Sequence, residues 1–445
     1  MTAMLRRVCL WCFLVGAVTP VFTQPAPAVD SFDSLFPCAG LDDRVDFWKM
    51  IFTRYGRNDV LLHDRNDLRL VYTVVTIPDG ATPRMQRQRL RAEERRLIQA
   101  FDELVSIGPD SEQPNPAQTK ILDALKRAGL APDPALLRKL RDNIHCQRGI
   151  REKFQDGLVR SGRYLPEMEK IFVARGLPRE LALLPHVESS FDYAAFSNKG
   201  AAGIWQITRG TGKGRLKIGR YVDERLDPLK AAEAAASLLR ENYQELGNWP
   251  LAITAYNQGK NGMLRAQAVL GSDIKKVVEN YQSRIFGFAG QNFYAEFLAA
   301  VQIARNYEEH FPSLQLDSPL DFETVSLTSR ATSRQLAARF GVTEATLRTY
   351  NPHLTRYFWW RSGIAPAGTT LRVPVGKIQS LAENVKPQDP LEQESRLTRY
   401  KVRRGDTLLK IARRFEIGVG ELMRANRMKG ARIYLGQLLL IPMGS

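Results

Sequence analysis

The spacing of apolar residues predicts a mainly helical unit over residues 147–312. Apolar side chains recur at helical intervals over 152–158, 165–175, 179–187 and 293–307. Asp227 and Pro228 form a helix start, and the apolar stripe that follows continues to Leu239. A further helix is expected to begin at Pro250 and to stop at Gly259. Long helices therefore dominate the central third of the chain.

The preceding region, residues 38–146, has a mixed pattern. Residues 68–77 are rich in Val, Tyr and Thr and predict a strand. Residues 84–104 are basic and then apolar at helical spacing, which predicts a helix. No function follows from this region.

Two small modules follow the helical unit. Residues 398–443 predict a strand, two helices and a final strand, and residues 321–376 repeat that outline in degenerate form. We call these the second and the first module, respectively. A polar, proline-containing linker, residues 377–397, separates them. The fold class is therefore α+β and multidomain, with a mainly α-helical domain and small β-α-α-β modules.

The first 28 residues have the pattern of a secretory signal. Arg6 and Arg7 precede a short apolar run that is interrupted by Pro20. An uncleaved anchor is the alternative, and the cysteines inside the run do not follow a lipidation motif. No later stretch is apolar for about 18 residues, so no membrane span is expected in the mature chain. The pattern predicts a protein secreted across the inner membrane.

Net charge indicates the kind of binding partner, and cysteine content indicates whether a disulfide is possible. The formal charge is +17, which favours a polyanionic partner: nucleic acid, wall polymers or a membrane surface. Cys38 and Cys146 remain after signal cleavage and are a possible disulfide in an oxidising compartment; two unpaired thiols are the alternative. The histidines show no metal-ligand spacing, so neither a metal nor another cofactor is predicted.

The strongest chemical signal is Glu188, at the end of an apolar helical segment. Leu184 and Val187 flank it and should desolvate it, which raises the pKa of a carboxyl group. A glutamic acid that stays protonated near neutral pH can donate a proton to a glycosidic oxygen. On this segment alone, a surface glutamate near a helix end would be the better interpretation.

The residues after Glu188 change that balance. Ser197 lies nine positions later and precedes the small-residue block 200–203. Trp205 offers a flat face for a sugar ring or, alternatively, a core side chain, and Gln206 offers a donor and an acceptor for an acetamido group. Tyr256, which ends a helix together with Asn257, can hold a carboxyl group or a sugar, or can simply pack in the core.

The chain resembles the catalytic domain of soluble lytic transglycosylases and goose-type lysozyme. The resemblance rests on four segments in a fixed order: Glu-Ser-Ser-Phe, a later Ser, the Gly-Ile-Trp-Gln block and Ala-Tyr-Asn. The Ile-Trp form resembles the membrane-bound lytic transglycosylase D subtype. The resemblance implies that Glu188 is the catalytic acid and base. It also implies a substrate-binding set: Ser189, Ser197, Gly203, Trp205, Gln206, Tyr256, Asn257 and Tyr294.

The resemblance also implies a mechanism with one carboxyl group. Ordinary glycosidases use two carboxylates, and no second acid stands out beside Glu188 in the sequence. Glu188 would protonate the oxygen between N-acetylmuramic acid and N-acetylglucosamine, while the acetamido group of the substrate stabilises the sugar cation. Glu188 would then accept the proton of the C6 hydroxyl, which closes a 1,6-anhydro ring without water.

The second module closely resembles a LysM domain, through Tyr400-x-Val402, Gly405-Asp406-Thr407, Asn426 and the final Leu-Ile-Pro. The resemblance implies binding of N-acetylglucosamine-containing glycans, with Gly405, Asp406, Thr407 and Tyr434 near the groove. The first module lacks the Gly-Asp-Thr turn, which leaves open whether it binds glycan.

We therefore expect a periplasmic, wall-associated enzyme whose partner is peptidoglycan and not nucleic acid. A water-using muramidase and a non-catalytic wall-binding protein are the alternatives. The first would leave different product ends, and the second is disfavoured by the intact set of site residues.

Overall fold

The computed structural model describes residues 31–108, 113–360, 363–378 and 397–442, except Arg404, Glu416, Arg427 and Lys429. The predicted signal segment and most of the predicted linker lie outside the described residues. The chain divides into two compact units, residues 1–37 and 38–445. The described end of the first unit carries the short helix α1 (Phe32–Leu35). No helix in the described ranges is both long and apolar enough to cross a membrane.

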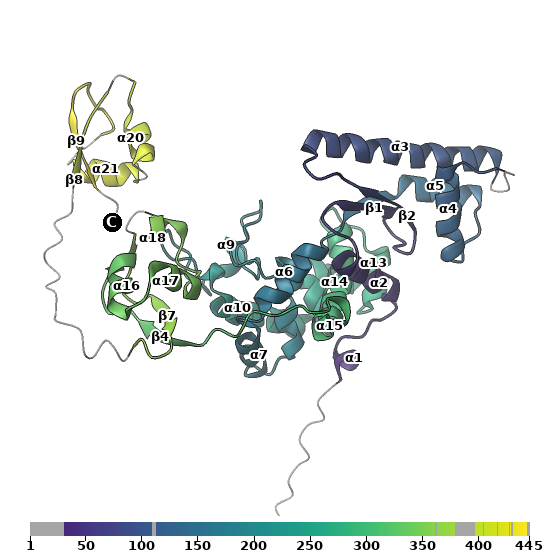
Figure 1. Cartoon of the computed structure of the whole chain (residues 1–445), viewed down its shortest axis with the longest axis horizontal. Helices are drawn as coiled ribbons and strands as arrows, with labels where there is room; N and C mark the ends of the chain where they lie inside the picture. Colours follow the sequence, from purple (N-terminus) through teal and green to yellow (C-terminus); the bar gives the residue numbers. More distant parts are fainter. Residues whose placement is uncertain are drawn as a thin grey trace, which may run out of the picture. The chain divides into compact units, whose positions relative to one another are not determined.

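Residues 151–310 form a helical domain, which confirms the predicted fold class (Figure 1). Its elements are α6 (Arg151–Ser161), α7 (Leu165–Val173), η1 (Arg179–Leu183), α8 (Pro185–Glu188), α9 (Arg209–Gly212), η2 (Glu224–Leu226), α10 (Pro228–Leu246), α11 (Trp249–Gln258), α12 (Lys260–Leu270), α13 (Ile274–Asn280), α14 (Phe288–Arg305) and α15 (Tyr307–His310). Helix α10 packs against α7 and α11, and α11 also packs against α14.

The predicted helix ends are confirmed where caps specify them. The side chain of Asp227 accepts hydrogen bonds from the first backbone amides of α10, and α11 ends at Gly259, whose φ is +84°. The expected helix over 179–187 is wrong in one respect, because it is two short elements, η1 and α8. Pro185 causes the break, since it has no N–H to donate to the carbonyl group four residues earlier.

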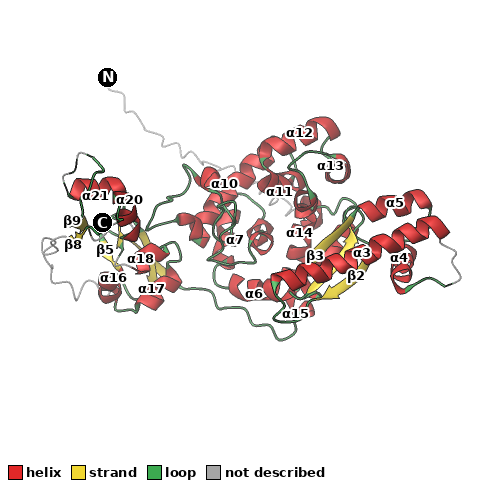
Figure 2. Cartoon of the chain, turned by 90° about the horizontal axis from the view of Figure 1, so that it is seen from above, coloured by secondary structure: helices red, strands yellow, loops and turns green. Residues whose placement is uncertain are grey.

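The region before the helical domain contributes helix α2 (Asp42–Thr53), which packs against α6 and α14. The buried guanidinium of Arg44 donates a hydrogen bond of 2.8 Å to Oδ1 of Asn292 in α14. A three-stranded antiparallel sheet follows in the order β2-β1-β3, from β1 (Asp59–Asp64), β2 (Val71–Thr76) and β3 (Ile144–Arg148). Helices α3 (Pro83–Ile107), α4 (Pro116–Arg127) and α5 (Pro134–Asp142) share a hydrophobic core with this sheet (Figure 2).

In both modules, helices lie between a first and a last strand that pair with each other in antiparallel fashion. The first consists of β4 (Phe322–Ser326), β5 (Ala331–Thr332), α16 (Ser333–Phe340), α17 (Glu344–Tyr350), α18 (Arg356–Trp360), β6 (Ile364–Ala365) and β7 (Thr370–Pro374), with β4 antiparallel to β7. The second consists of β8 (Leu397–Lys401), α20 (Leu408–Arg414), α21 (Val419–Ala425) and β9 (Leu438–Pro442), with β8 antiparallel to β9. The internal repeat seen in the sequence is thus a structural repeat.

The possible disulfide is not formed, and that prediction is wrong for this structure. Both Cys38 and Cys146 are free thiols. Cys38 lies just before α2, where burial and the side chain of Asp42 raise its pKa to about 12. Cys146 lies within β3, opposite Leu62 of β1, and the electrostatic influence on its thiol comes from Glu94 of α3. The two thiols therefore face different elements.

Candidate active site

Glu188 is the last residue of α8 and is half-buried. Burial raises the pKa of its carboxyl group to about 8. Among the described residues, this carboxyl group has no hydrogen-bond or ion-pair partner. An acid that is desolvated by its surroundings, yet not committed to a protein group, is available to donate a proton to a ligand.

The other side of α8 is packed by aromatic rings. The imidazole of His186 lies with its centroid 5.2 Å from that of Phe154 and 4.5 Å from that of Phe191. Neither ring nitrogen of His186 has a hydrogen-bond partner in the described structure, and burial lowers its pKa to about 3. His186 is therefore neutral, and it contributes to the apolar packing behind the acid.

The two residues after Ser189 adopt a strained backbone. Ser190 and Phe191 have φ values of +55° and +53°, which residues other than glycine rarely adopt. Arg160 of α6 stabilises this turn by donating hydrogen bonds to the carbonyl oxygens of Ser190 (2.8 Å) and Phe191 (3.1 Å). The turn reverses the chain directly after Glu188 and leads into the loop that carries Gln206.

Residues 197–207 form this catalytic loop, which begins at Ser197. The amide of Ala201 donates to Oγ of Ser197 at 3.0 Å, and the amide of Ser197 donates to the carbonyl oxygen of Ala201 at 2.9 Å. The Ser197 side chain thus shapes the loop itself. Its predicted place in the substrate-binding set stays a prediction.

The loop depends on a glycine at position 203. Gly203 has φ +74°, and an added Cβ would lie 1.9 Å from the carbonyl oxygen of Arg225. Gln206, with φ +46°, donates from Nε2 to the carbonyl oxygen of Gly203 at 2.9 Å. This bond fixes the amide nitrogen and leaves Oε1 available as an acceptor. The predicted Gly-x-x-Gln block is therefore one compact turn.

A buried ion pair supports the catalytic loop from behind. Arg225 donates from Nε and Nη2 to Asp223 at 2.9 and 2.7 Å. Its Nη1 donates to the carbonyl oxygens of Gly200 (2.8 Å) and Ile207 (3.3 Å). One guanidinium therefore holds both ends of the Gly200–Ile207 segment. The sequence does not indicate this role of Arg225, because a charged residue in a loop carries no signal of burial.

Tyr256, at the end of α11, joins the site. Its hydroxyl group donates to the carbonyl oxygen of Trp205 at 2.8 Å. Burial and the nearby charge of Glu188 raise the pKa of Tyr256 above its usual value, which places the phenol close to the acid. Asn257 is exposed and accepts a hydrogen bond from the side chain of Gln258. The structure thus brings Glu188, Gln206 and Tyr256 into one region, with Asn257 on the surface beside Tyr256.

The predicted stacking of Trp205 on a sugar is wrong, and Tyr294, whose predicted role stays a prediction, is also buried. Trp205 has no exposed surface, stacks on Phe172 at a centroid distance of 5.6 Å, and donates from Nε1 to the carbonyl oxygen of Pro228. It is not available to stack on a sugar, because its contacts with Phe172 and Pro228 place the ring in the core. Tyr294 is 1% exposed, and burial, together with Cys38, raises its pKa. Its phenol therefore faces the N-terminal region.

The acid that the sequence did not reveal is Glu296, two residues after Tyr294 on α14. Burial and the charge of Glu188 together raise the pKa of Glu296 to about 8. Positions two apart in a helix point in nearly opposite directions, which explains why Glu296 and not Tyr294 faces Glu188. The available signal was an acidic residue within an otherwise apolar helical stretch.

The second module has its own candidate binding loops. Asp406 accepts hydrogen bonds from the Tyr400 hydroxyl (2.7 Å) and the Arg403 amide (2.8 Å), and Thr407 caps α20. Gly405, with φ +88°, permits this turn. Tyr434 is 64% exposed and is available for contact. No group of His, Cys, Asp or Glu in the described ranges is arranged to bind a metal ion.

Comparison with known proteins defines the class. The transglycosylase SLT domain matches residues 173–277, which include Glu188, Gln206 and Tyr256, and the LysM domain matches residues 400–442. The chain therefore contains a transglycosylase SLT domain followed by a LysM domain, which confirms the predicted resemblance.

Several known proteins are similar to parts of this chain. Membrane-bound lytic murein transglycosylase D from two strains of Escherichia coli is 28% identical over 313 residues, which are 67% of this chain and 68% of the relative. A putative tributyltin chloride resistance protein from Alteromonas sp. is 38% identical over 102 residues, 22% of this chain and 47% of the relative. The 70 kDa soluble lytic transglycosylase of Escherichia coli, a solved structure, shares 17% identity over 54% of this chain and 56% of its own, with a TM-score of 0.27. The chain is homologous to lytic murein transglycosylase D.

Proposed function

We propose that this chain is a peptidoglycan lytic transglycosylase with Glu188 as its only acid and base. The observation that carries the proposal is the Glu188 carboxyl group, which is half-buried, without a protein partner, and has a pKa of about 8. At neutral pH it is therefore protonated, which is the state required to donate a proton to the oxygen between N-acetylmuramic acid and N-acetylglucosamine. The SLT and LysM domains support peptidoglycan as the substrate.

The reaction proceeds in two proton transfers. Glu188 protonates the leaving oxygen, and the carbonyl oxygen of the acetamido group of the substrate stabilises the positive charge at C1. The ionised Glu188 then accepts the proton of the C6 hydroxyl as this oxygen attacks C1. The product carries a 1,6-anhydromuramoyl end, and attack within one sugar ring has a large effective concentration compared with attack by water.

The loop residues position the substrate. In the proposed complex, Oε1 of Gln206 accepts a hydrogen bond from the N-acetyl amide of the sugar, since Nε2 is already bonded to Gly203. Tyr256 keeps the Trp205–Gln206 peptide in place through its hydroxyl group. Ser189 donates a hydrogen bond to the carbonyl oxygen of Ile204, and Ser197 accepts one from the amide of Ala201, so both serines support the loop.

Glu296 is the specific observation that bears on the muramidase alternative, which needs a second carboxylate or a held water. With a pKa of about 8, Glu296 is mostly protonated at neutral pH, so only a small fraction of it is ionised and able to accept a proton from water. A hydrolytic route that uses Glu296 as its base is therefore disfavoured at that pH. This favours the transglycosylase.

The C-terminal LysM domain binds N-acetylglucosamine-containing strands in this proposal and raises the local concentration of substrate. The net charge of +17 suits an anionic wall. A cell-envelope location follows from the substrate. We further propose that residues 1–28 direct secretion and that the enzyme acts in the periplasm.

The test is a Glu188→Gln variant, with Glu308→Gln on the exposed face of α15 as the matched control. Purified sacculi are digested, and the products are analysed by mass spectrometry. We expect anhydro ends from the wild type and the control, and none from Glu188→Gln. Products with reducing ends would support the muramidase, and undiminished clearing of sacculi by Glu188→Gln would contradict the role of Glu188.

A further inference from the structure

The two modules share an asparagine clasp that aligns them residue by residue. In the second module, Asn426 donates to the carbonyl oxygens of Leu422 (2.8 Å) and Leu440 (2.7 Å) and accepts from the amide of Leu440 (2.7 Å). In the first module, Asn351 makes the same three bonds. It donates to the carbonyl oxygens of Leu347 (2.9 Å) and Arg372 (2.7 Å) and accepts from the amide of Arg372 (2.7 Å). Arg372 therefore occupies the place of Leu440.

The same alignment places His353 of the first module where the second has Met428, two residues after the clasp asparagine. At these two positions, the LysM domain has an apolar side chain and the first module has an ionisable one. Both are buried, with 5% of Arg372 and 3% of His353 exposed. Charged groups are rarely buried unless they are paired, so this exchange needs a partner.

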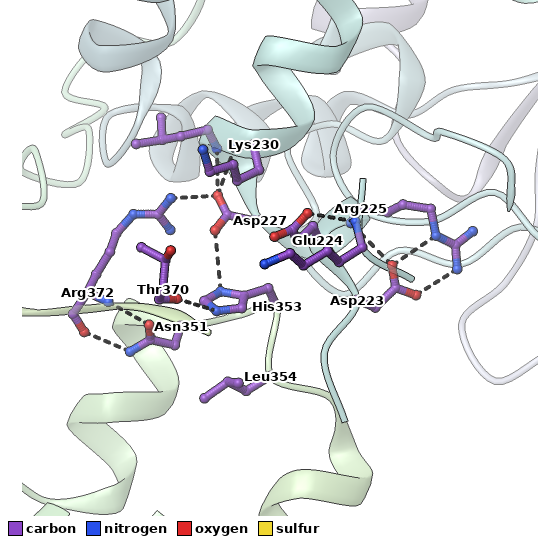
Figure 3. Close-up of polar contacts among 12 residues, drawn as sticks. Asp223, Glu224, Arg225, Asp227, Lys230, Asn351, His353, Leu354, Thr370 and Arg372 are labelled. Atoms are coloured by element: carbon purple, nitrogen blue, oxygen red, sulfur yellow. Dashed lines mark hydrogen bonds and ion pairs between the residues drawn. The ribbon is translucent and has the colours of Figure 1, made fainter. Parts of the chain in front are cut away.

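The partner is Asp227, which belongs to the helical domain. Arg372 donates from Nη2 to Asp227 at 2.6 Å, and Nδ1 of His353 lies 3.3 Å from the other carboxylate oxygen (Figure 3). Burial alone would raise the pKa of Asp227, but Arg372 and His353 outweigh it and hold that pKa below its usual value. The guanidinium also lies 5.9 Å from the ring centroid of Tyr164 in the helical domain.

A second set of contacts extends this interface. Val222 pairs with Leu354 in an antiparallel bridge, and the amide of Asp223 donates to the carbonyl oxygen of His353 at 2.9 Å. Val222 is also part of the hydrophobic core of the first module. The first module therefore completes its core with a residue of the helical domain, and the 220–223 segment is fixed by module residues.

This segment leads directly to the active site. The carboxylate of Asp223, whose backbone is bound to His353, holds the guanidinium of Arg225. Arg225 in turn binds the carbonyl oxygens of Gly200 and Ile207, at the two ends of the turn that carries Gln206. An unbroken series of contacts thus joins the first module to the catalytic loop, and Figure 3 shows two of its parts, the Asp227 contacts and the pair of Asp223 and Arg225.

We propose that the first module is a positioning element for the catalytic loop, held by Arg372 on Asp227, and not a second glycan-binding module. The proposal rests on the function proposed above. The glycan-binding turn of the second module is replaced here, since Arg330 and Ala331 stand where Gly405 and Asp406 would be, before the helix-capping Thr332. The first module therefore has the fold and the asparagine clasp of the second module. It lacks the glycan-binding turn and has an interface with the helical domain.

The test uses the full chain with Arg372→Leu, which restores the LysM residue, Arg372→Lys, which keeps a cation for Asp227, and Arg339→Leu, an exposed control on α16. Hydrogen exchange is measured for amides of residues 200–207, together with kcat and KM on soluble glycan strands and binding to insoluble sacculi. For Arg372→Leu we expect faster exchange in the loop and a kcat that is lower by roughly 10- to 100-fold, because small displacements of positioning groups have effects of that size.

Binding of Arg372→Leu to sacculi should match the wild type, exchange in α11 and α14 should stay slow, and Arg372→Lys should recover most of kcat. Unchanged exchange at residues 200–207 in a folded Arg372→Leu protein would overturn the proposal. So would a loss of sacculus binding with unchanged kcat, which a glycan-binding module predicts. If the wild type makes no anhydro ends, the proposed function fails, whereas the exchange result still decides whether the module holds the loop.

Discussion

The hydroxyl group of Ser189 donates a hydrogen bond of 2.9 Å to the carbonyl oxygen of Ile204, so the residue after the acid is bound to the loop that carries Gln206. Ser189 is buried, and both groups lie in a region from which water is largely excluded. The bond spans 15 residues of sequence. It fixes Glu188 and Gln206 relative to each other, which a proton transfer to a bound amino sugar requires.

The first prediction concerns this bond. Ser189→Ala should lower kcat by roughly tenfold, because the loop can shift relative to Glu188, and should lower the free energy of unfolding by about 1 kcal/mol. Kinetics on soluble glycan strands and denaturant unfolding measure the two effects. Ser190→Ala is the matched control, since the Ser190 hydroxyl makes only a long contact of 3.4 Å to the carbonyl oxygen of His186. Equal losses of kcat in both variants would contradict the assignment.

The second prediction concerns Glu296 and the pH dependence of the reaction. Because Glu188 must be protonated to act as an acid and its pKa is about 8, kcat should fall as pH rises through that value. The charge of Glu188 raises the pKa of Glu296, and because such an interaction is mutual, an ionised Glu296 should also make it harder for Glu188 to lose its proton. In Glu296→Gln this negative charge cannot form, so kcat should begin to fall at lower pH. A pH profile that is unchanged, or displaced to higher pH, would show that the two carboxyl groups do not interact.

The third prediction concerns stability. The ordinary pKa of a glutamate is 4.5, and that of Glu188 is about 8 in the folded chain. Between these values the unfolded chain releases a proton that the folded chain retains, so this group destabilises the fold progressively as pH rises. Glu188→Gln has no such proton. Its Tm should match the wild type near about pH 4 and exceed it increasingly up to about pH 8. Calorimetry across this range tests the prediction, and a constant difference would exclude it.

The fourth prediction concerns the LysM domain. Tyr434 is exposed on a loop, and aromatic side chains dominate many binding surfaces. Tyr434→Ala should weaken binding to insoluble sacculi by about tenfold and should reduce turnover of sacculi more than turnover of soluble strands. Leu409→Ala, at another exposed apolar position on α20, is the control. A loss of soluble turnover equal to the loss on sacculi would mean that Tyr434 does not act through wall binding.

Local features of the chain were predictable because their causes are local. Asp227 before Pro228 specifies the start of α10, and Gly259 specifies the end of α11, since caps depend on one or two residues. The order of Glu188, the Gly-Ile-Trp-Gln block and Tyr256 likewise indicated the class of site. The break at Pro185 was missed, although its cause is equally local.

The errors at the site share a different cause. Trp205 was expected at the sugar and lies in the core, and Glu296, which the sequence does not indicate, lies close to Glu188. A sequence lists side chains but does not state which side of a loop or a helix the rest of the chain will cover. Burial is decided by packing between segments that are distant in sequence.

The sequence by itself determined the elements, their caps, the acid and the class of the two matched domains, because each depends on residue type and short spacing. Only the tertiary structure decided that Glu296 lies beside Glu188, that Cys38 and Cys146 face different elements, and that Arg372 meets Asp227 across 145 residues. These relationships arise when the chain removes apolar surface from water and must then pair every charge that it buries, a condition that applies only to the folded whole.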